Sequence, residues 1–253
     1  MSEALDGYFK LENQPGKQAK ISTQHLKLYH LVRAMGRPTV VECGVDVGIS
    51  NLVLRAACEE TDGHLYSIDI RDCSQVASSP AWTFIQSDDR DVEAILRQAP
   101  AIAEGIDLIH IDSLHTEEHV LAQLDSWFKY VKQGGYLTFH DIDNMLYRPG
   151  QWRESRSMAE GNAGVAKAVR EFFHANEDEL FLEFHFGVTG MGIMKKLMPR
   201  DKVPNPAIPV PDWPSAPPPK VRESARMLAS AIGRSLAYRF RRVQARAASR
   251  VPE

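Results

Sequence analysis

The sequence contains few cysteines and no long apolar run. Three cysteines occur among 253 residues, Cys43, Cys58 and Cys73, and none has the C-x-x-C spacing of a zinc or redox motif. They cannot all pair, so they indicate buried or free thiols in a reducing compartment. Apolar runs stay well short of the ~20 residues of a membrane span, and residues 1–20 lack the apolar core of a secretory signal. We therefore expect a cytoplasmic protein.

Acidic and basic residues are unevenly distributed, although the formal net charge is only −3. Residues 220–253 carry a net charge of +7, which leaves −10 for residues 1–219. Apolar residues recur every three or four positions over residues 221–248, which predicts an amphipathic helix with arginines on its other face. We expect this helix to associate with an anionic membrane surface or with a second copy of the chain. Few aromatic residues separate the arginines, so nucleic acid is not an expected partner.

Predicted strands and helices alternate along most of the chain, which favours a doubly wound, mostly parallel sheet. The predicted strands are residues 39–43, 64–70, 82–86, 106–111, 136–140, 180–187 and 191–195. The predicted helices are residues 22–35, 52–57, 92–98, 117–131 and 165–174. Only Val188, Thr189 and Gly190 separate the last two strands, so we expect an antiparallel hairpin at the C-terminal end of the sheet.

Eight prolines between Pro204 and Pro219 predict a semi-extended linker. The sequence therefore predicts four parts. These are a lead-in (residues 1–20), an α/β domain (21–198), a Pro-rich linker (199–219) and a basic amphipathic helix (220–253).

A glycine-containing turn follows the first predicted strand. Gly44 and Gly48 lie in the run Val-Val-Glu-Cys-Gly-Val-Asp-Val-Gly-Ile-Ser at residues 40–50, where a strand gives way to a helix. Such a turn lets a ligand approach the backbone and directs helix N–H groups toward it, although a purely structural turn also uses glycine. The dinucleotide pattern G-x-G-x-x-G is absent, because Asp46 occupies its middle glycine position. The turn therefore predicts a nucleotide site with little room for a pyrophosphate.

Acidic residues follow the ends of successive predicted strands: Glu42, Asp69, Asp88, Asp89, Asp112 and Asp141. Ligands of open α/β sheets bind at this edge, so we expect these carboxylates to converge there. Asp69, at the end of the second strand, is placed to accept hydrogen bonds from a ribose diol. Asp46 would repel a diphosphate, whereas S-adenosylmethionine (SAM) carries a sulfonium and an amino acid instead. The pattern favours SAM over a dinucleotide.

These motifs resemble those of the class I SAM-dependent methyltransferases, and within them small-molecule O-methyltransferases similar to the catechol, macrolide-sugar and cephalosporin-biosynthesis enzymes. The resemblance covers about residues 20–197 and lies in residues 42–50, 66–69, 109–115, 134–141 and 190–195. It implies a seven-stranded Rossmann-like sheet. It also implies these cofactor-binding residues: Glu42, Gly44, Val45, Asp46, Gly48, Ser50, Asp69, Ile70, Ser87, Asp88, Asp89 and Asp112.

The resemblance also implies a divalent ion and a catalytic base. Asp112, His140 and Asp141 match the metal positions of such enzymes, and Mg²⁺ or Mn²⁺ is the expected ion. His140 stands where the family commonly has a carboxylate, and imidazole suits Mn²⁺, Fe²⁺ or Zn²⁺ better than Mg²⁺. His115 matches the base of the catechol-type enzymes and, with Asp112, is expected to be catalytic. The alternative is that His115 only caps or orients the helix near Glu117.

The expected activity is SAM-dependent O-methylation of a hydroxyl on a small molecule or sugar, with divalent-metal assistance. Residues 143–164 fall where this family builds its acceptor pocket, and Arg148, Trp152, Arg153 and Arg156 would meet an anionic or sugar-bearing substrate or form a solvated loop. One alternative is a non-catalytic or hydroxylase-associated binding protein on the same fold. An NAD-dependent oxidoreductase is less favoured, because the three-glycine turn is missing.

Overall fold

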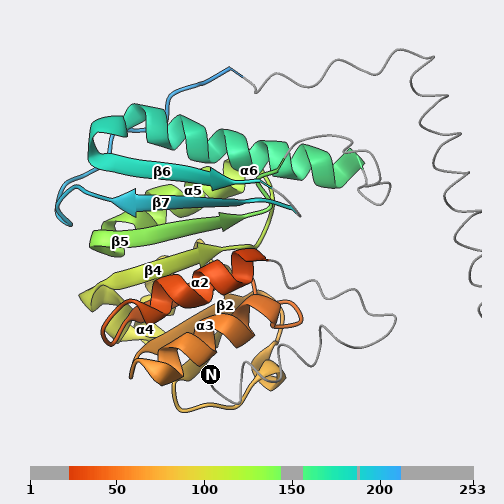
Figure 1. Cartoon of the computed structure of the whole chain (residues 1–253), viewed down its shortest axis with the longest axis vertical. Helices are drawn as coiled ribbons and strands as arrows, with labels where there is room; N and C mark the ends of the chain where they lie inside the picture. The colour runs from red at the N-terminus through yellow and green to blue at the C-terminus, as the bar shows by residue number, and fades with distance from the viewer. Residues whose placement is uncertain (1–22, 144–155, 187–188, 212–253) are drawn as a thin grey trace, which may run out of the picture. The chain divides into compact units, whose positions relative to one another are not determined.

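The computed structural model describes residues 23–143, 156–186 and 189–211, and for residues 156–159 it describes the backbone alone (Figure 1). The predicted lead-in, the predicted helix at 221–248 and the acceptor-loop residues Arg148, Trp152 and Arg153 lie outside these ranges. The backbone of Arg156 begins a helix, and its side chain lies outside the description. Within the described ranges, every helix is too short or too polar to cross a membrane.

Seven strands form one sheet in the order β3-β2-β1-β4-β5-β7-β6. The strands are β1 (Thr39–Cys43), β2 (His64–Asp69), β3 (Trp82–Gln86), β4 (Ile106–Ile111), β5 (Val131–His140), β6 (Leu180–His185) and β7 (Met191–Lys196). Neighbouring strands from β3 to β5 pair in parallel, whereas β7 runs antiparallel to both β5 and β6 (Figure 1). This sheet confirms the predicted fold class and its antiparallel C-terminal strands.

Helices cover both faces of the sheet. They are α2 (Thr23–Arg33), α3 (Ile49–Glu60), α4 (Val92–Gln98), α5 (Glu117–Trp127) and α6 (Arg156–Ala175), with short 3₁₀ turns η1 (Ser74–Val76), η2 (Pro100–Glu104), η3 (Phe128–Tyr130) and η4 (Glu177–Glu179). In Figure 1, α2 and α3 lie side by side over the near face, and α4 and α5 lie behind the strands. Strands buried on both faces by helices need mostly apolar sequence, which β1 and β4 have apart from Glu42 in β1 and Asp107 and His110 in β4.

Three elements begin earlier than the sequence predicts; α3 begins at Ile49 instead of residue 52, and β5 and α6 differ more. Strand β5 starts at Val131 because α5 ends at Trp127 and a 3₁₀ turn follows, so Gly134 lies inside the strand and not before it. The pairing of β5 with β4 shifts register between Ile106 and Leu108, which accommodates this glycine-containing stretch. Helix α6 starts at Arg156, nine residues before the predicted start. It includes Gly161 and Gly164, although glycine disfavours a helix interior.

The first part of the predicted linker contacts α6. The Asn205 backbone N–H donates to Asn176 Oδ1 at 2.7 Å, and the Ile208 N–H donates to the Glu171 carbonyl at 3.2 Å. Val210 N–H donates to the Glu171 carboxylate at 3.3 Å. Residues 205–210 are therefore held along the helix, which an extended Pro-rich segment can do because its free backbone groups remain available for pairing.

Candidate active site

A cavity of about 560 Å³ opens at the carboxyl ends of the parallel strands β1 to β4. Its lining comprises Gly44, Asp46, Ile68, Asp69, Ile70, Arg71, Ser87, Asp88, Asp89, Arg90, Asp112, Ser113, Leu114, His115 and His119. This volume lies in the range of small-molecule sites, and the location is where open α/β sheets bind ligands. Most of the predicted cofactor-binding residues therefore meet at one cavity.

Gly44 brings the turn after β1 against the end of β4. Its φ is +92°, and a Cβ placed there would lie 2.2 Å from the Asp112 carbonyl oxygen. Any other residue would therefore push β1 and β4 apart. Asp46 also adopts a positive φ, of 47°, and its exposed carboxylate pairs with Arg71 at 3.0 Å. Gly44 and Asp46 line the cavity, but the packing of the turn against β4 already requires the glycine, so a role of this turn in binding stays a prediction.

Asp69 fixes this turn from the end of β2. Its Oδ2 accepts hydrogen bonds from Val45 N at 2.9 Å and Asp46 N at 3.2 Å, and its Oδ1 accepts from Arg71 N at 2.9 Å. Burial alone would raise the pKa of Asp69, but these three backbone donors hold it below its ordinary value. The exposed Arg71 side chain also approaches, with its Nε 3.5 Å from Asp69 Oδ1, so a ligand hydroxyl at this carboxylate would replace that longer contact.

Glu42 and Ser50 lie in the core beneath the turn and do not line the cavity. Glu42 accepts hydrogen bonds from Ser50 Oγ and Ser67 Oγ, both at 2.6 Å, and from Asn51 Nδ2 at 3.1 Å. Burial raises the pKa of Glu42 to about 7, although the three donors oppose this. Val45 and Gly48, also predicted as cofactor-binding residues, likewise lie outside the lining. These residues shape the turn from behind.

Two apolar side chains line the cavity and remain exposed. Ile70 follows β2 with 71% of its surface exposed, and Leu114 follows β4 with 58% exposed. Single exposed apolar side chains are common, but these two lie together on the lining of one cavity. They offer apolar walls for a flat group such as a nucleobase.

A polar group beside Asp89 was not found from the sequence. His119 Nε2 lies 2.9 Å from Asp89 Oδ1, and Gln123 Nε2 donates to Asp89 Oδ2 at 3.0 Å. His119 and Gln123 are four residues apart on α5, so they share one helix face. The four-residue spacing of these polar side chains could indicate a shared polar face of α5. The apolar residues of α5 indicate only a helix that packs on the sheet. The neighbouring Asp88 pairs with Arg90 at 2.8 Å instead.

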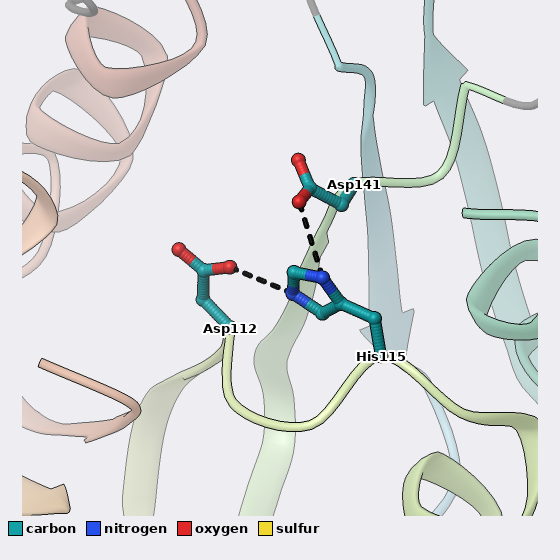
Figure 2. Close-up of side chains that lie close together, drawn as sticks. All are labelled: Asp112, His115 and Asp141. Carbon is teal, nitrogen blue, oxygen red and sulfur yellow. Dashed lines mark hydrogen bonds and ion pairs between the residues drawn. The ribbon is translucent and has the colours of Figure 1, made fainter. Parts of the chain in front are cut away.

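His115 lies between the carboxylates of Asp112 and Asp141 (Figure 2). Its Nε2 is 3.1 Å from Asp112 Oδ1, and its Nδ1 is 3.2 Å from Asp141 Oδ2. Asp112 and His115 lie on the loop after β4, and Asp141 follows β5 with a positive φ of 55°. Thr116 caps α5 by accepting a hydrogen bond from His119 N at 3.3 Å. The capping role that the sequence left open for His115 therefore belongs to Thr116.

Opposite charges set the protonation of this cluster. Burial alone would raise the pKa values of Asp112 and Asp141, but the adjacent imidazoles hold both below their ordinary range. Burial alone would lower the pKa values of His115 and His140, but the carboxylates raise both. The two carboxylates thus stabilise positive charge between them.

The donor set fits a divalent ion. Asp112, His115 and Asp141 each offer one ligand atom, and these atoms lie within 4.8 Å of one another. His140 Nδ1 lies 3.3 Å from Asp112 Oδ1 and 3.0 Å from Asp141 Oδ1, yet neither contact has hydrogen-bond geometry. Carboxylate oxygens with imidazole nitrogens are common ligands of divalent ions. The predicted ligands therefore lie together, and the structure adds His115 to them.

Two further histidines, missed in the sequence, face this cluster. The ring centroid of His25, on α2, lies 5.7 Å from that of His140, and the centroid of His110, on β4, lies 6.3 Å from it. Burial is the main cause that lowers the pKa of His25 to about 4 and that of His110 to about 3. His110 precedes Asp112 by two positions, so the alternation of β4 could have placed it on the same side.

Comparison with known sequences identifies a methyltransferase domain. A family model described as "Methyltransferase domain" matches residues 41–142, which include the glycine turn, Asp112, His115 and Asp141. The chain is also 33% identical over 57 residues to the uncharacterised protein R132 of Acanthamoeba polyphaga mimivirus. That match covers 22% of this chain and 26% of the viral protein.

Solved structures share the fold. The MycE methyltransferase of the mycinamycin biosynthetic pathway, in complex with Mg and SAH, is 21% identical with a TM-score of 0.54, and the match covers 84% of this chain and 57% of MycE. The SAH-bound Podospora anserina methyltransferase PaMTH1 is 14% identical, with a TM-score of 0.55 and coverage of 78% and 88%. A Bacillus cereus O-methyltransferase in complex with SAH is 14% identical, with a TM-score of 0.55 and coverage of 78% and 91%.

The sheet order and the likeness to these structures show a Rossmann-like methyltransferase fold, and residues 41–142 match the model of a methyltransferase domain. The chain spans little more than half the length of MycE.

Proposed function

We propose that the chain is a SAM-dependent methyltransferase that O-methylates a hydroxyl group on a small molecule or sugar. The observation that carries this proposal is a single cavity that runs from the glycine turn to the Asp112–His115 pair. One end of that cavity suits a nucleoside, and the other end offers a base beside two carboxylates. Neighbours of the same fold were solved with SAH, the product that SAM leaves after methyl transfer.

The charge of the cavity favours SAM over a dinucleotide. Its lining includes five aspartates and two arginines, so its net charge is negative, which would repel a diphosphate but attract a sulfonium. Asp69 lies at the cavity at the end of β2, where its carboxylate would accept a hydrogen bond from a ribose hydroxyl in place of the 3.5 Å contact with the exposed Arg71 side chain. Ile70 and Leu114 would contact the two faces of the adenine, which explains their exposure in the structure.

His115 is the proposed general base. It would take the proton of the acceptor hydroxyl while the oxygen forms its bond to the methyl carbon and the bond from that carbon to sulfur breaks. Both ring nitrogens contact carboxylates in the structure, so one contact must give way to free a lone pair. Asp112 and Asp141 would hold the resulting imidazolium in place.

Asp112, Asp141 and the adjacent imidazole of His140 would hold the divalent ion. A bound ion would lower the pKa of the acceptor hydroxyl and fix its oxygen. MycE was also solved with Mg, SAH and mycinamycin VI together. This supports an acceptor of the hydroxylated small-molecule class for the present chain.

Calorimetric titration tests the cofactor assignment. We expect SAM and SAH to bind and NAD to show no heat of binding. Gly44→Ala should weaken SAM binding about 10-fold or more, because its Cβ would collide with the Asp112 backbone. Gly134→Ala is the matched control, since Gly134 has a similar positive φ of 82° but no atom within 4 Å of the added Cβ. Binding of NAD in place of SAM would refute the assignment.

Transfer of a labelled methyl group from SAM to a panel of hydroxylated acceptors tests the reaction. We expect a methyl ether on an acceptor of the panel, and a reduced rate after treatment with a chelator. SAM binding without transfer to any member would favour the non-catalytic alternative.

A further inference from the structure

Imidazole groups dominate the surroundings of the proposed ion site. His25, His110 and His140 come from three separate elements, α2, β4 and the end of β5, and meet beside Asp112 and Asp141. An all-oxygen site needs none of these rings. Of these three rings, His140 contacts both carboxylates, and an imidazole nitrogen beside carboxylate oxygens suits a transition ion.

Several atoms of this group are buried without a hydrogen bond. Among the described residues, His110 Nε2, His140 Nδ1 and Asp141 Oδ1 have no hydrogen-bond partner. His110 is fully buried, and its other nitrogen lies 2.9 Å from Thr138 Oγ1. Unsatisfied buried polar atoms are rare and costly, so each requires an explanation. His140 Nδ1 and Asp141 Oδ1 are only 3.0 Å apart yet not hydrogen-bonded, as expected of two donors directed at a common ion.

We infer that this site selects a first-row transition ion over Mg²⁺, with His140 Nδ1 as a ligand beside the carboxylates of Asp112 and Asp141. The inference rests on the proposed function for the existence of the ion site, and it adds the identity of the ion. Mg²⁺ requires near-octahedral oxygen ligands, whereas imidazole suits Mn²⁺, Co²⁺ and Zn²⁺. The affinity order should be Zn²⁺ above Co²⁺ above Mn²⁺, with Mg²⁺ weakest.

The contacts favour His140 over His115 as the nitrogen ligand. His115 makes its contacts with Asp112 and Asp141 through both nitrogens and lies on the loop that lines the cavity. His140 Nδ1 lies 3.3 Å from Asp112 and 3.0 Å from Asp141 without hydrogen-bond geometry, and Thr189 Oγ1 lies 3.3 Å from its other nitrogen. A second contact of this kind fixes the ring orientation of a metal-binding histidine. His115 is then left to act on the acceptor.

Metal titration of the full chain, stripped with a chelator, tests the inference. We expect Mn²⁺ to bind about 100-fold more tightly than Mg²⁺ in calorimetry. We also expect Co²⁺ to give a visible absorption spectrum that reports nitrogen coordination. His140→Glu should weaken Co²⁺ binding, abolish its nitrogen signature and bring the Mn²⁺ to Mg²⁺ ratio down about 10-fold or more. His140→Gln should weaken the binding of every ion. It therefore distinguishes loss of the nitrogen ligand from its replacement by a carboxylate.

His30→Glu provides the matched control, because it makes the same change at an exposed histidine of α2. It should leave all affinities unchanged. SAM binding by each variant shows that it is folded. Equal affinity of the parent chain for Mg²⁺ and Mn²⁺, or an unchanged ratio in His140→Glu, would overturn the inference. Absence of ion binding would also overturn it, whereas the methyltransferase proposal fails only if SAM is not bound or no methyl group is transferred.

Discussion

The polar clusters around Glu42 and around Asp112 lie at the ends of the paired strands β1 and β4, but they differ in how their hydrogen bonds are satisfied. Both oxygens of Glu42 accept hydrogen bonds, and Asn51 Oδ1 is the exception in its cluster. The Asp112 cluster instead contains several unpartnered buried atoms and a histidine between two carboxylates. A satisfied cluster fixes the fold, whereas an unsatisfied one is arranged for something that binds.

The largest expected effect is on the unsatisfied cluster. His115→Gln keeps a polar side chain of similar length but cannot take a proton at neutral pH. We expect turnover to fall by about 10² to 10⁴, with SAM affinity unchanged within about twofold. Initial rates and calorimetry measure the two quantities. His30→Gln, at an exposed position of α2, should change neither. A normal rate in His115→Gln would remove His115 from the mechanism.

The satisfied cluster should respond through stability and pH. Glu42 has a pKa of about 7 in the folded chain, above its unfolded value of 4.5. Its protonated form is therefore favoured by folding, so its contribution to stability is complete below the unfolded pKa and is lost as pH rises through the folded pKa. This loss amounts to about 3 kcal/mol. Glu42→Gln should remove that part of the pH dependence of the unfolding free energy.

Denaturant unfolding at about pH 5 and pH 8 measures this difference. Glu93→Gln is the control, because Glu93 is exposed in the first turn of α4 and should preserve the parental slope. The same slope in Glu42→Gln as in the parent chain would show that Glu42 does not titrate in this range. The Glu42 cluster would then make no pH-dependent contribution to stability.

The sequence predicted the sheet better than the site, for a physical reason. Strands β1 and β4 can be predicted because both are mostly apolar, a pattern that depends only on neighbouring positions in the sequence. The meeting of Asp112 with Asp141 could also be predicted, since both follow parallel strands. The position of His25 beside His140 could not be predicted, because it depends on how α2 packs across the sheet.

Contacts made through the backbone were equally hidden. Asp69 was predicted as a ribose acceptor, and its location at the cavity agrees with that, but its bonds to Val45 N and Asp46 N depend on the folded turn. Glu42 was grouped with the cofactor-binding residues by its place in the motif. Glu42 is buried beneath α3. Because both faces of β1 are buried, the alternation of its side chains does not tell which of them lie under α3.

The smallest expected effect concerns the support of His115. Helix α6 approaches this loop at Gly161, where an added Cβ would lie 3.2 Å from the His115 carbonyl and 3.3 Å from its Cβ. Alanine favours helix over glycine by about 1 kcal/mol, which should offset the tight contact, so we expect Gly161→Ala to melt within a few degrees of the parent. A displacement of His115 by a few tenths of an ångström should still lower turnover about two- to tenfold, measured as kcat at saturating SAM.

Gly36→Ala, where the new Cβ meets no atom within 4 Å, should leave kcat unchanged. An unaltered kcat in Gly161→Ala would show that α6 does not set the position of the base, and that the carboxylates alone hold it.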